Sequence, residues 1–157
     1  MGSIQRYTCA ASGRSATPQA TQKLESSPKQ WAAARANAPA WFDRALAAPF
    51  DESRVVVEGC SIRTLRWGQP GSPGIVLVHG GAANAHCWSH IAPQIPEYCV
   101  AALDLSGHGS SGRRDTYPRE TWAREVLAVA MDAGIAGPPI VIGHSMGGQI
   151  NPARSPT

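Results

Sequence analysis

The chain has 157 residues, of which 43% are hydrophobic and 16% are charged. This composition is typical of one globular domain with a sizeable core, and it excludes a chain that is disordered throughout. The formal net charge of +3 is mildly basic, but no patch of interleaved basic and aromatic residues indicates a nucleic-acid partner.

Membrane, metal and disulfide chemistry are not indicated either. No apolar run approaches the roughly 20 residues that span a bilayer, and Met1 to Ala20 lacks the apolar centre of a secretory signal. The cysteines are widely spaced and form no Cys-x-x-Cys pair; they are Cys9, Cys60, Cys87 and Cys99. Such spacing predicts neither a zinc site nor a disulfide framework, so we expect a cytoplasmic protein.

The first fifty residues predict two different segments. Residues 1–26 are rich in Ser, Thr, Ala, Gln and Gly and show no apolar period, which predicts a disordered leader. Ser27-Pro28 is typical of a helix start, and apolar residues recur on one side of the segment that follows. We therefore expect a helical segment over residues 27–50, with one or two short helices interrupted near Pro39 and ending at Pro49.

A main domain is expected over residues 51–150, and its first feature is a hairpin. Arg54–Glu58 and Ser61–Trp67 carry the β-branched and aromatic residues of strands, and they are joined around Gly59-Cys60.

The next two strands are expected to be buried. Gly74–His79 and Tyr98–Asp104 are short, continuous apolar runs, which are typical of strands covered on both faces of a parallel sheet. Between them, Cys87–Ile95 has the length for a crossover helix.

A longer helix and a last strand complete the pattern. Thr121–Ala133 is rich in helix formers, and Gly134 stands where a C-terminal cap belongs. Pro138-Pro139 should separate this helix from a strand over Ile140–Ile142. The order of hairpin, strand, helix, strand, helix and strand predicts an α/β fold with a mostly parallel, doubly wound sheet.

The most informative motif is Gly143-His144-Ser145-Met146-Gly147-Gly148, which follows that last strand directly. The pattern Gly-x-Ser-x-Gly predicts a strand-to-helix elbow, where glycines remove side chains that would collide across the tight turn. The serine is then held at a strained, exposed backbone position. Ser145 is therefore the candidate nucleophile.

Two further motifs accompany the elbow. His79-Gly80-Gly81 follows the third strand, and Asp104-Leu105-Ser106-Gly107-His108-Gly109-Ser110-Ser111 follows the fourth. In this order and spacing, residues from about Val55 to Gly148 resemble the N-terminal half of an α/β-hydrolase fold protein. The resemblance extends more weakly to Trp41-Phe42-Asp43-Arg44, and is closest to bacterial serine esterases, lipases and cofactor-free haloperoxidase-like members.

The resemblance implies a carboxylic ester hydrolase that acts on a small-molecule ester or acyl substrate without a cofactor or metal. Ser145 matches the nucleophile, and the backbone N–H groups of Gly81 and Met146 match the two oxyanion-hole donors. Epoxide hydrolases and haloalkane dehalogenases of this fold carry Asp at the elbow, which Ser145 argues against. Two alternatives stay open: a haloperoxidase-like enzyme that makes peracids, and a non-catalytic interaction module.

Other polar residues near these motifs are interpreted as structural. We expect His79 and His144 to hydrogen-bond the backbone around the two loops, and Asp104 and His108 to hold the turn after the fourth strand. Asp104 is therefore not assigned as a catalytic acid, and Trp88 is expected to pack beneath the substrate loop.

Two other patterns in the sequence indicate different functions. Gly107–Gly112 satisfies the dinucleotide-binding pattern Gly-x-Gly-x-x-Gly, but the residues after it do not form an apolar helix face. His86 and His90 have the spacing of a helical metal pair, but no third ligand at a metal-like spacing supports them.

The sequence after the elbow departs from the family pattern. In this fold the acid and the histidine follow the serine, yet no His, Asp or Glu follows Ser145. Residues 151–157 contain Pro152 and Pro156 and are expected to be an aberrant tail rather than a buried helix. We therefore expect a truncated, inactive fragment whose strand Ile140–Ile142 is an exposed edge, open to self-association.

Overall fold

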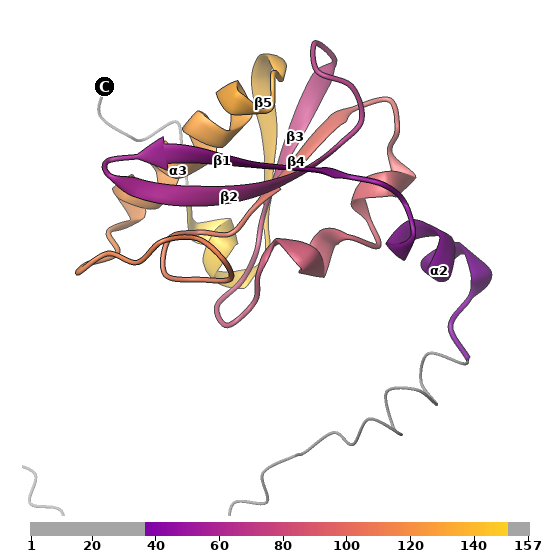
Figure 1. Ribbon diagram of the computed structural model, residues 1–157, viewed down its shortest axis with the longest axis horizontal. Coiled ribbons are helices and arrows are strands. Elements are labelled where there is room, and N and C mark those ends of the chain that lie inside the picture. Colours follow the sequence, from indigo (N-terminus) through magenta and orange to yellow (C-terminus); the bar gives the residue numbers. More distant parts are fainter. Residues whose placement is uncertain (1–36, 151–157) are drawn as a thin grey trace, which may run out of the picture. The chain divides into compact units, whose positions relative to one another are not determined.

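The computed structural model describes residues 37–150 (Figure 1). The expected leader, the first part of the helical segment and the tail over residues 151–157 lie outside this part. The described part opens with the short helix α2, Ala40–Leu46. Pro39 occupies the position before its first turn with φ −61°, so the interruption expected there is the start of a helix.

Five strands form one sheet, and in Figure 1 its first two strands lie in front of the other three. They are β1 Asp51–Val57, β2 Cys60–Trp67, β3 Pro73–Val78, β4 Cys99–Leu103 and β5 Ala136–Gly143. The spatial order is β1-β2-β4-β3-β5. β1 and β2 are antiparallel, β2 is antiparallel to β4, and β4, β3 and β5 are parallel to one another. The predicted α/β fold with a mostly parallel sheet is confirmed.

The predicted hairpin is present and longer than expected at its start. Its two turn residues, Glu58 and Gly59, both have positive φ, at 47° and 75°. Two successive positive φ angles match the right-handed twist of the flanking strands. β1 begins at Asp51 because the pairing continues to Arg66, and the two side chains form an ion pair there.

The core has one layer on each face of β3 and β4, as their continuous apolar runs predicted. On one face, Val76, Val78, Ala101 and Leu103 pack with the buried side of α3, Arg119–Asp132. On the other face, the alternate residues Ile75, Leu77, Val100 and Ala102 pack with Ala85 and Ala92. Both faces of these strands are therefore removed from water.

The predicted crossover helix over Cys87–Ile95 is wrong. The segment contains two short 3₁₀ helices instead, η1 Ala85–Trp88 and η2 Ala92–Gln94. Pro93 lacks an N–H and clashes with the preceding turn of an α-helix, so a continuous helix cannot pass through it. The side chain of Asn84 caps η1 by accepting from the N–H of His86 at 3.0 Å.

Helix α3 ends as predicted at Gly134, which has φ 69°. The N–H of Ile135 donates to the carbonyl of Ala130 at 3.2 Å, and the N–H of Gly134 donates to Met131 at 3.0 Å. This pair of bonds is the Schellman motif, which satisfies carbonyls that the helix itself leaves unpaired.

Strand β5 begins earlier than predicted, because Pro138 and Pro139 lie inside it rather than before it. Prolines are tolerated there since β5 is an edge strand of the described sheet, and its register with β3 is irregular at that point. Ile140 is 53% exposed and Ile142 is 44% exposed, so the expected apolar edge is confirmed. Between residues 37 and 150, no helix is long and apolar enough to cross a membrane.

Candidate active site

Ser145 follows β5 directly and begins the short 3₁₀ helix η3, Ser145–Gln149. Its φ is 52°, a left-handed conformation that costs a non-glycine residue on the order of 1–3 kcal/mol. The residue is exposed. These are the strained, outward-facing features that the elbow motif predicted for a nucleophile. The strand-to-helix turn that the motif predicts is present, with η3 as a single short 3₁₀ helix that ends at Gln149.

The glycines of the elbow are required by close backbone contacts. A Cβ on Gly143 would lie 2.5 Å from the nitrogen of Gly148 and closer still to the carbonyl of Gly147. A Cβ on Gly147 would lie 2.5 Å from the carbonyl oxygen of Val78. All of these neighbours are backbone atoms that cannot swing away, so the motif tolerates only glycine at both positions.

The loop after β3 packs against the elbow. Val78 pairs with Gly143 in neighbouring parallel strands, so both chains leave the sheet at the same edge. A Cβ on Gly80 would lie 3.3 Å from the Cβ of Ser145 and 2.8 Å from Nδ1 of His144. Two of the predicted motifs therefore meet at one place.

Two backbone donors at this place are unused. In the part of the chain that the structure describes, neither the N–H of Gly81 nor that of Met146 donates a hydrogen bond, and the hydroxyl of Ser145 has no partner. A side chain added at Gly81 would find no atom within 4 Å, so the space above it is open. An incoming oxygen atom could accept from these amides without displacing a protein group.

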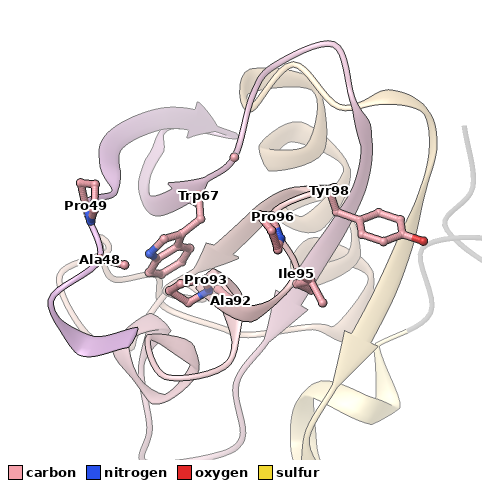
Figure 2. Close-up of a pocket in the computed structure, with 9 residues that line it drawn as sticks. Ala48, Pro49, Trp67, Ala92, Pro93, Ile95, Pro96 and Tyr98 are labelled. Atoms are coloured by element: carbon pink, nitrogen blue, oxygen red, sulfur yellow. The ribbon is translucent and has the colours of Figure 1, made fainter. Parts of the chain in front are cut away.

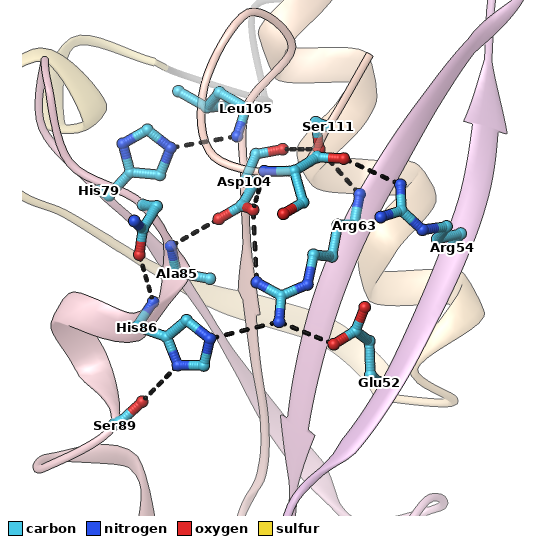
Figure 3. A network of polar contacts seen from close by, with 12 residues as sticks. Glu52, Arg54, Arg63, His79, Ala85, His86, Ser89, Asp104, Leu105 and Ser111 are labelled. Carbon is cyan, nitrogen blue, oxygen red and sulfur yellow. Dashed lines mark hydrogen bonds and ion pairs between the residues drawn. The ribbon is translucent and has the colours of Figure 1, made fainter.

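His79 is structural, as predicted, and its buried ring uses both nitrogens. Its Nδ1 contacts the carbonyl oxygen of Gly80 at 2.7 Å. The N–H of Leu105 donates to its Nε2 at 3.1 Å, as Figure 3 shows. Burial lowers the pKa of His79 below its ordinary value of 6.5. By contrast, the ring of His144 is exposed and makes no hydrogen bond to described residues, so the backbone contact expected of it is wrong.

Asp104 holds the turn after β4, as predicted. Its fully buried carboxylate accepts from the N–H of Ala85 at 2.7 Å and from the N–H of Ser110 at 2.8 Å (Figure 3). The ring nitrogen Nδ1 of His108 lies 3.3 Å from the carbonyl oxygen of Ser106. Both residues thus stabilise the loop rather than face the elbow serine.

A buried arginine, which the sequence does not predict, completes this polar network. The Nη1 of Arg63 lies 3.5 Å from Asp104, and its Nη2 lies 2.7 Å from Glu52 and 3.2 Å from Nε2 of His86 (Figure 3). The hydrogen bond to Glu52 raises the pKa of Arg63, and the same bond lowers the pKa of Glu52. No local pattern could reveal this group, because it forms only when the strand register is known.

The rival patterns have structural explanations. No helix opens after Gly107–Gly112, because the chain stays irregular until Arg119, so this loop does not have the dinucleotide-binding arrangement. His86 contacts Arg63 and Ser89, while the ring of His90 lies tilted against that of Phe42 with centroids 5.4 Å apart.

Cys60, Cys87 and Cys99 are free thiols. Trp88 is partly buried and packs against the apolar cluster that contains Leu65 and Leu77. Its expected place beneath a substrate loop stays a prediction. Among residues 37–150, no group of three or more His, Cys, Asp or Glu side chains could hold a metal ion.

A small cleft lies elsewhere on the sheet (Figure 2). It has a volume of about 170 Å³ and is lined by apolar side chains, among them Trp67, Ile95 and Pro93. Tyr98 precedes β4, so the cleft lies at the amino end of that strand, whereas Ser145 follows the carboxyl end of β5. Ligand pockets usually measure about 300–1,000 Å³, and they lie at the carboxyl ends of parallel strands in such sheets.

Comparison with known proteins places this fold and site in a family. The model of the alpha/beta hydrolase family matches residues 75–155, which are 81 of the 157 residues and include both the Gly80 loop and the elbow. The chain therefore belongs to the alpha/beta hydrolase family.

Curated relatives include a lipase and an esterase of Mycobacterium tuberculosis. The lipase is 32% identical over 93 residues, covering 54% of this chain and 32% of the lipase. The esterase is 36% identical over 93 residues, covering 59% of this chain and 30% of the esterase. Protein phosphatase methylesterase 1 of Bos taurus is 35% identical over 97 residues, covering 57% of this chain and 25% of that protein.

Solved structures of similar proteins superpose on this chain. A membrane phospholipase A, described as a bacterial virulence factor, superposes with a TM-score of 0.60 at 30% identity, covering 78% of this chain and 38% of that chain. Epoxide hydrolase A from Mycobacterium thermoresistibile gives a TM-score of 0.60 at 27% identity, covering 65% of this chain and 33% of that chain. This chain spans about a third or less of the curated relatives that it matches.

Proposed function

We propose that this chain is a carboxylic ester hydrolase of its family, with Ser145 as the nucleophile. The observation that carries the proposal is that a serine at φ 52° and two unused backbone N–H groups, those of Gly81 and Met146, belong to motifs that meet at one sheet edge. The names of the lipase, esterase and methylesterase relatives support an ester as the substrate class.

In the proposed reaction, the oxygen of Ser145 attacks the carbonyl carbon of the ester. The carbonyl oxygen becomes an oxyanion, which accepts hydrogen bonds from the N–H groups of Gly81 and Met146. Donors fixed before the reaction stabilise this charge without rearranging, and one such donor contributes about 2.7–4 kcal/mol in comparable sites. The bond between the carbonyl carbon and the alkoxy oxygen then breaks, and the alcohol leaves with a proton equivalent to the one that Ser145 loses. Water hydrolyses the acyl-serine, which releases the acid and restores the hydroxyl.

A base is required to take the serine proton, and the chain offers no suitable one. No His, Asp or Glu follows Ser145 in the 157 residues. Of the five histidines, all before the serine, His79 uses both ring nitrogens and His86 faces Arg63 and Ser89. His90 lies against Phe42, and Nδ1 of His108 lies beside the carbonyl of Ser106. His144 is next to the serine, but its exposed ring has no hydrogen-bond partner among the described residues that would orient it as a base. We therefore propose that the 157-residue chain alone is acylated slowly and turns over substrate only in trace amounts.

Acetyl mapping tests the role of Ser145 without requiring turnover. The purified chain is incubated with p-nitrophenyl acetate, digested with protease, and the acetylated residues are located by mass spectrometry. We expect Ser145 to carry more acetyl than Ser110. Ser110 is also an exposed serine, but no oxyanion donor is assigned to it. The matched variants are Ser145→Ala and Ser110→Ala.

Ser145→Ala should abolish the label at the elbow, and Ser110→Ala should leave it unchanged. Equal labelling of Ser145 and Ser110 in a folded chain would overturn the nucleophile assignment. A stably folded chain that is not acetylated at the elbow would favour the non-catalytic module instead.

A further inference from the structure

The ring of His79 exists in one defined tautomer. The N–H of Leu105 is a donor, so Nε2, at 3.1 Å, must carry the lone pair that accepts it. The hydrogen therefore resides on Nδ1, which donates to the carbonyl oxygen of Gly80 at 2.7 Å. Because the ring is fully buried, water cannot replace either partner. His79 thus joins the loop after β4 to the loop after β3.

This contact fixes the orientation of the peptide unit between Gly80 and Gly81. The described chain has no cis peptide bond, so the carbonyl of Gly80 and the N–H of Gly81 point in opposite directions. The carbonyl is held by His79 and also by the N–H of Ala83, at 3.3 Å. The N–H of Gly81 must therefore point away from both of these groups.

The local backbone would not hold this orientation by itself. Glycine at positions 80 and 81 leaves the peptide unit free to rotate, and Ala82 has φ 58°, a conformation that a non-glycine residue adopts only when its surroundings impose it. The same peptide lies beside the nucleophile, since a Cβ on Gly80 would be 3.3 Å from the Cβ of Ser145.

We propose that His79 is a positioning residue, which orients the N–H of Gly81 as an oxyanion donor by holding the carbonyl of Gly80. The role of this N–H as an oxyanion donor rests on the proposed function. Its orientation, however, can be measured without any reaction. His79 acts as a neutral donor here, and it neither touches the substrate nor accepts the serine proton.

Two substitutions separate the two hydrogen bonds of the ring. In His79→Asn, the side-chain nitrogen is as many bonds from Cα as Nδ1 is, so the donor to Gly80 is kept and the acceptor for Leu105 is lost. In His79→Gln, the side-chain oxygen can take the place of Nε2, so the acceptor is kept and the donor is lost. Each variant loses one hydrogen bond and is the control for the other.

The readout is the order parameter of the Gly81 amide, from ¹⁵N relaxation of the 157-residue chain. We expect about 0.85 in the wild type and in His79→Asn, and below about 0.6 in His79→Gln. Equal values in the two variants would overturn the proposal, because a merely structural histidine would loosen the loop in both. In the wild type, long-range ¹H–¹⁵N spectra should place the ring hydrogen of His79 on Nδ1. A hydrogen on Nε2 would overturn the proposal, and this measurement does not require either variant to fold.

This experiment is independent of acetyl transfer. Ordered Gly81 without labelling of Ser145 would refute the proposed function and retain the positioning role. Labelling of Ser145 together with equal disorder of Gly81 in both variants would refute the positioning role and retain the proposed function.

Discussion

The guanidinium of Arg114 and the carboxylate of Glu125 form an ion pair at 3.1 Å, in which the carboxylate is fully buried. Glu125 lies on α3 and also accepts from the N–H of Ser106 at 3.0 Å. Arg114 donates onward to the carbonyl of Val57 at 2.6 Å. This pair therefore joins the loop after β4 to α3 and to the end of the β1–β2 hairpin.

Breaking this pair from one side should destabilise the fold strongly. Glu125→Leu leaves the guanidinium of Arg114 largely buried without its counter-charge, and such losses cost about 3–5 kcal/mol. The double variant Glu125→Leu with Arg114→Met removes both charges and should cost less than the sum of the single variants. Urea unfolding of the four proteins measures this. Additive losses would show that the two side chains are not coupled.

Substitution within the elbow should destabilise the fold through a backbone collision. Gly147→Ala places a Cβ 2.5 Å from the carbonyl oxygen of Val78, and overpacking of this kind costs about 1–3 kcal/mol. Gly81→Ala is the matched control, since its Cβ meets open space, and we expect a change within about 0.5 kcal/mol. Thermal unfolding measures both, and equal losses would contradict this account of the elbow.

Steady-state hydrolysis of p-nitrophenyl acetate should be weak in this chain. A site with an oxyanion hole but no base retains only about 10³–10⁴-fold acceleration over water. We therefore expect Ser145→Ala to change the trace rate little. Turnover at the rate of ordinary esterases, abolished by that substitution, would show that a base is recruited from the chain itself or from a second copy.

Stability should fall as the pH is lowered below about 6.5, because burial lowers the pKa of His79 in the folded chain. Unfolding exposes the ring, so the unfolded chain binds a proton that the folded chain excludes between the two pKa values. One such group contributes a slope of at most about 1.4 kcal/mol per pH unit. His79→Asn should lack this part of the slope in unfolding experiments between pH 5 and 8. An identical slope in both proteins would show that His79 titrates alike in the two states.

The exposed side of β5 should promote self-association. Ile140 and Ile142 lie on the same side of this edge strand, and both are about half exposed. Ile142→Lys should shift the chain toward the monomer in sedimentation velocity. Met131→Lys, at an exposed position on α3, is the control and should leave the distribution unchanged. A monomeric wild type, or an equal effect of both substitutions, would contradict a role for the edge.

The sequence predicted those parts of the molecule that depend on local pattern. β3 and β4 were expected because their runs are apolar throughout, and the Schellman end of α3 was expected from Gly134. The elbow could be recognised because its glycines and Ser145 are adjacent in the chain. The two 3₁₀ helices of the crossover differ from the prediction because the segment has the length of an α-helix but contains Pro93, which interrupts one.

The buried ion pairs could not be predicted, since they join distant residues. Asp104 and Arg63 are 41 positions apart, and Arg114 reaches a carbonyl 57 positions away. Such contacts depend on strand register and loop path, which no single segment specifies. The unused N–H groups of Gly81 and Met146 likewise could not be predicted, because the hydrogen-bond partners of a loop depend on how the two loops pack. The domain limits at residues 26, 50 and 150 stay predictions.

The two prolines of β5 restrict how a further strand could pair with this sheet. Successive N–H groups of a strand point alternately to its two edges, so either Pro138 or Pro139 leaves a missing donor on the outer edge. Only Ile140–Gly143 then offers an unbroken outer edge, a length of about 13 Å at roughly 3.3 Å per residue. A partner strand would have to align with these four residues, so one short pairing register is favoured. The alternative registers along a long edge, which lead to fibres, are disfavoured.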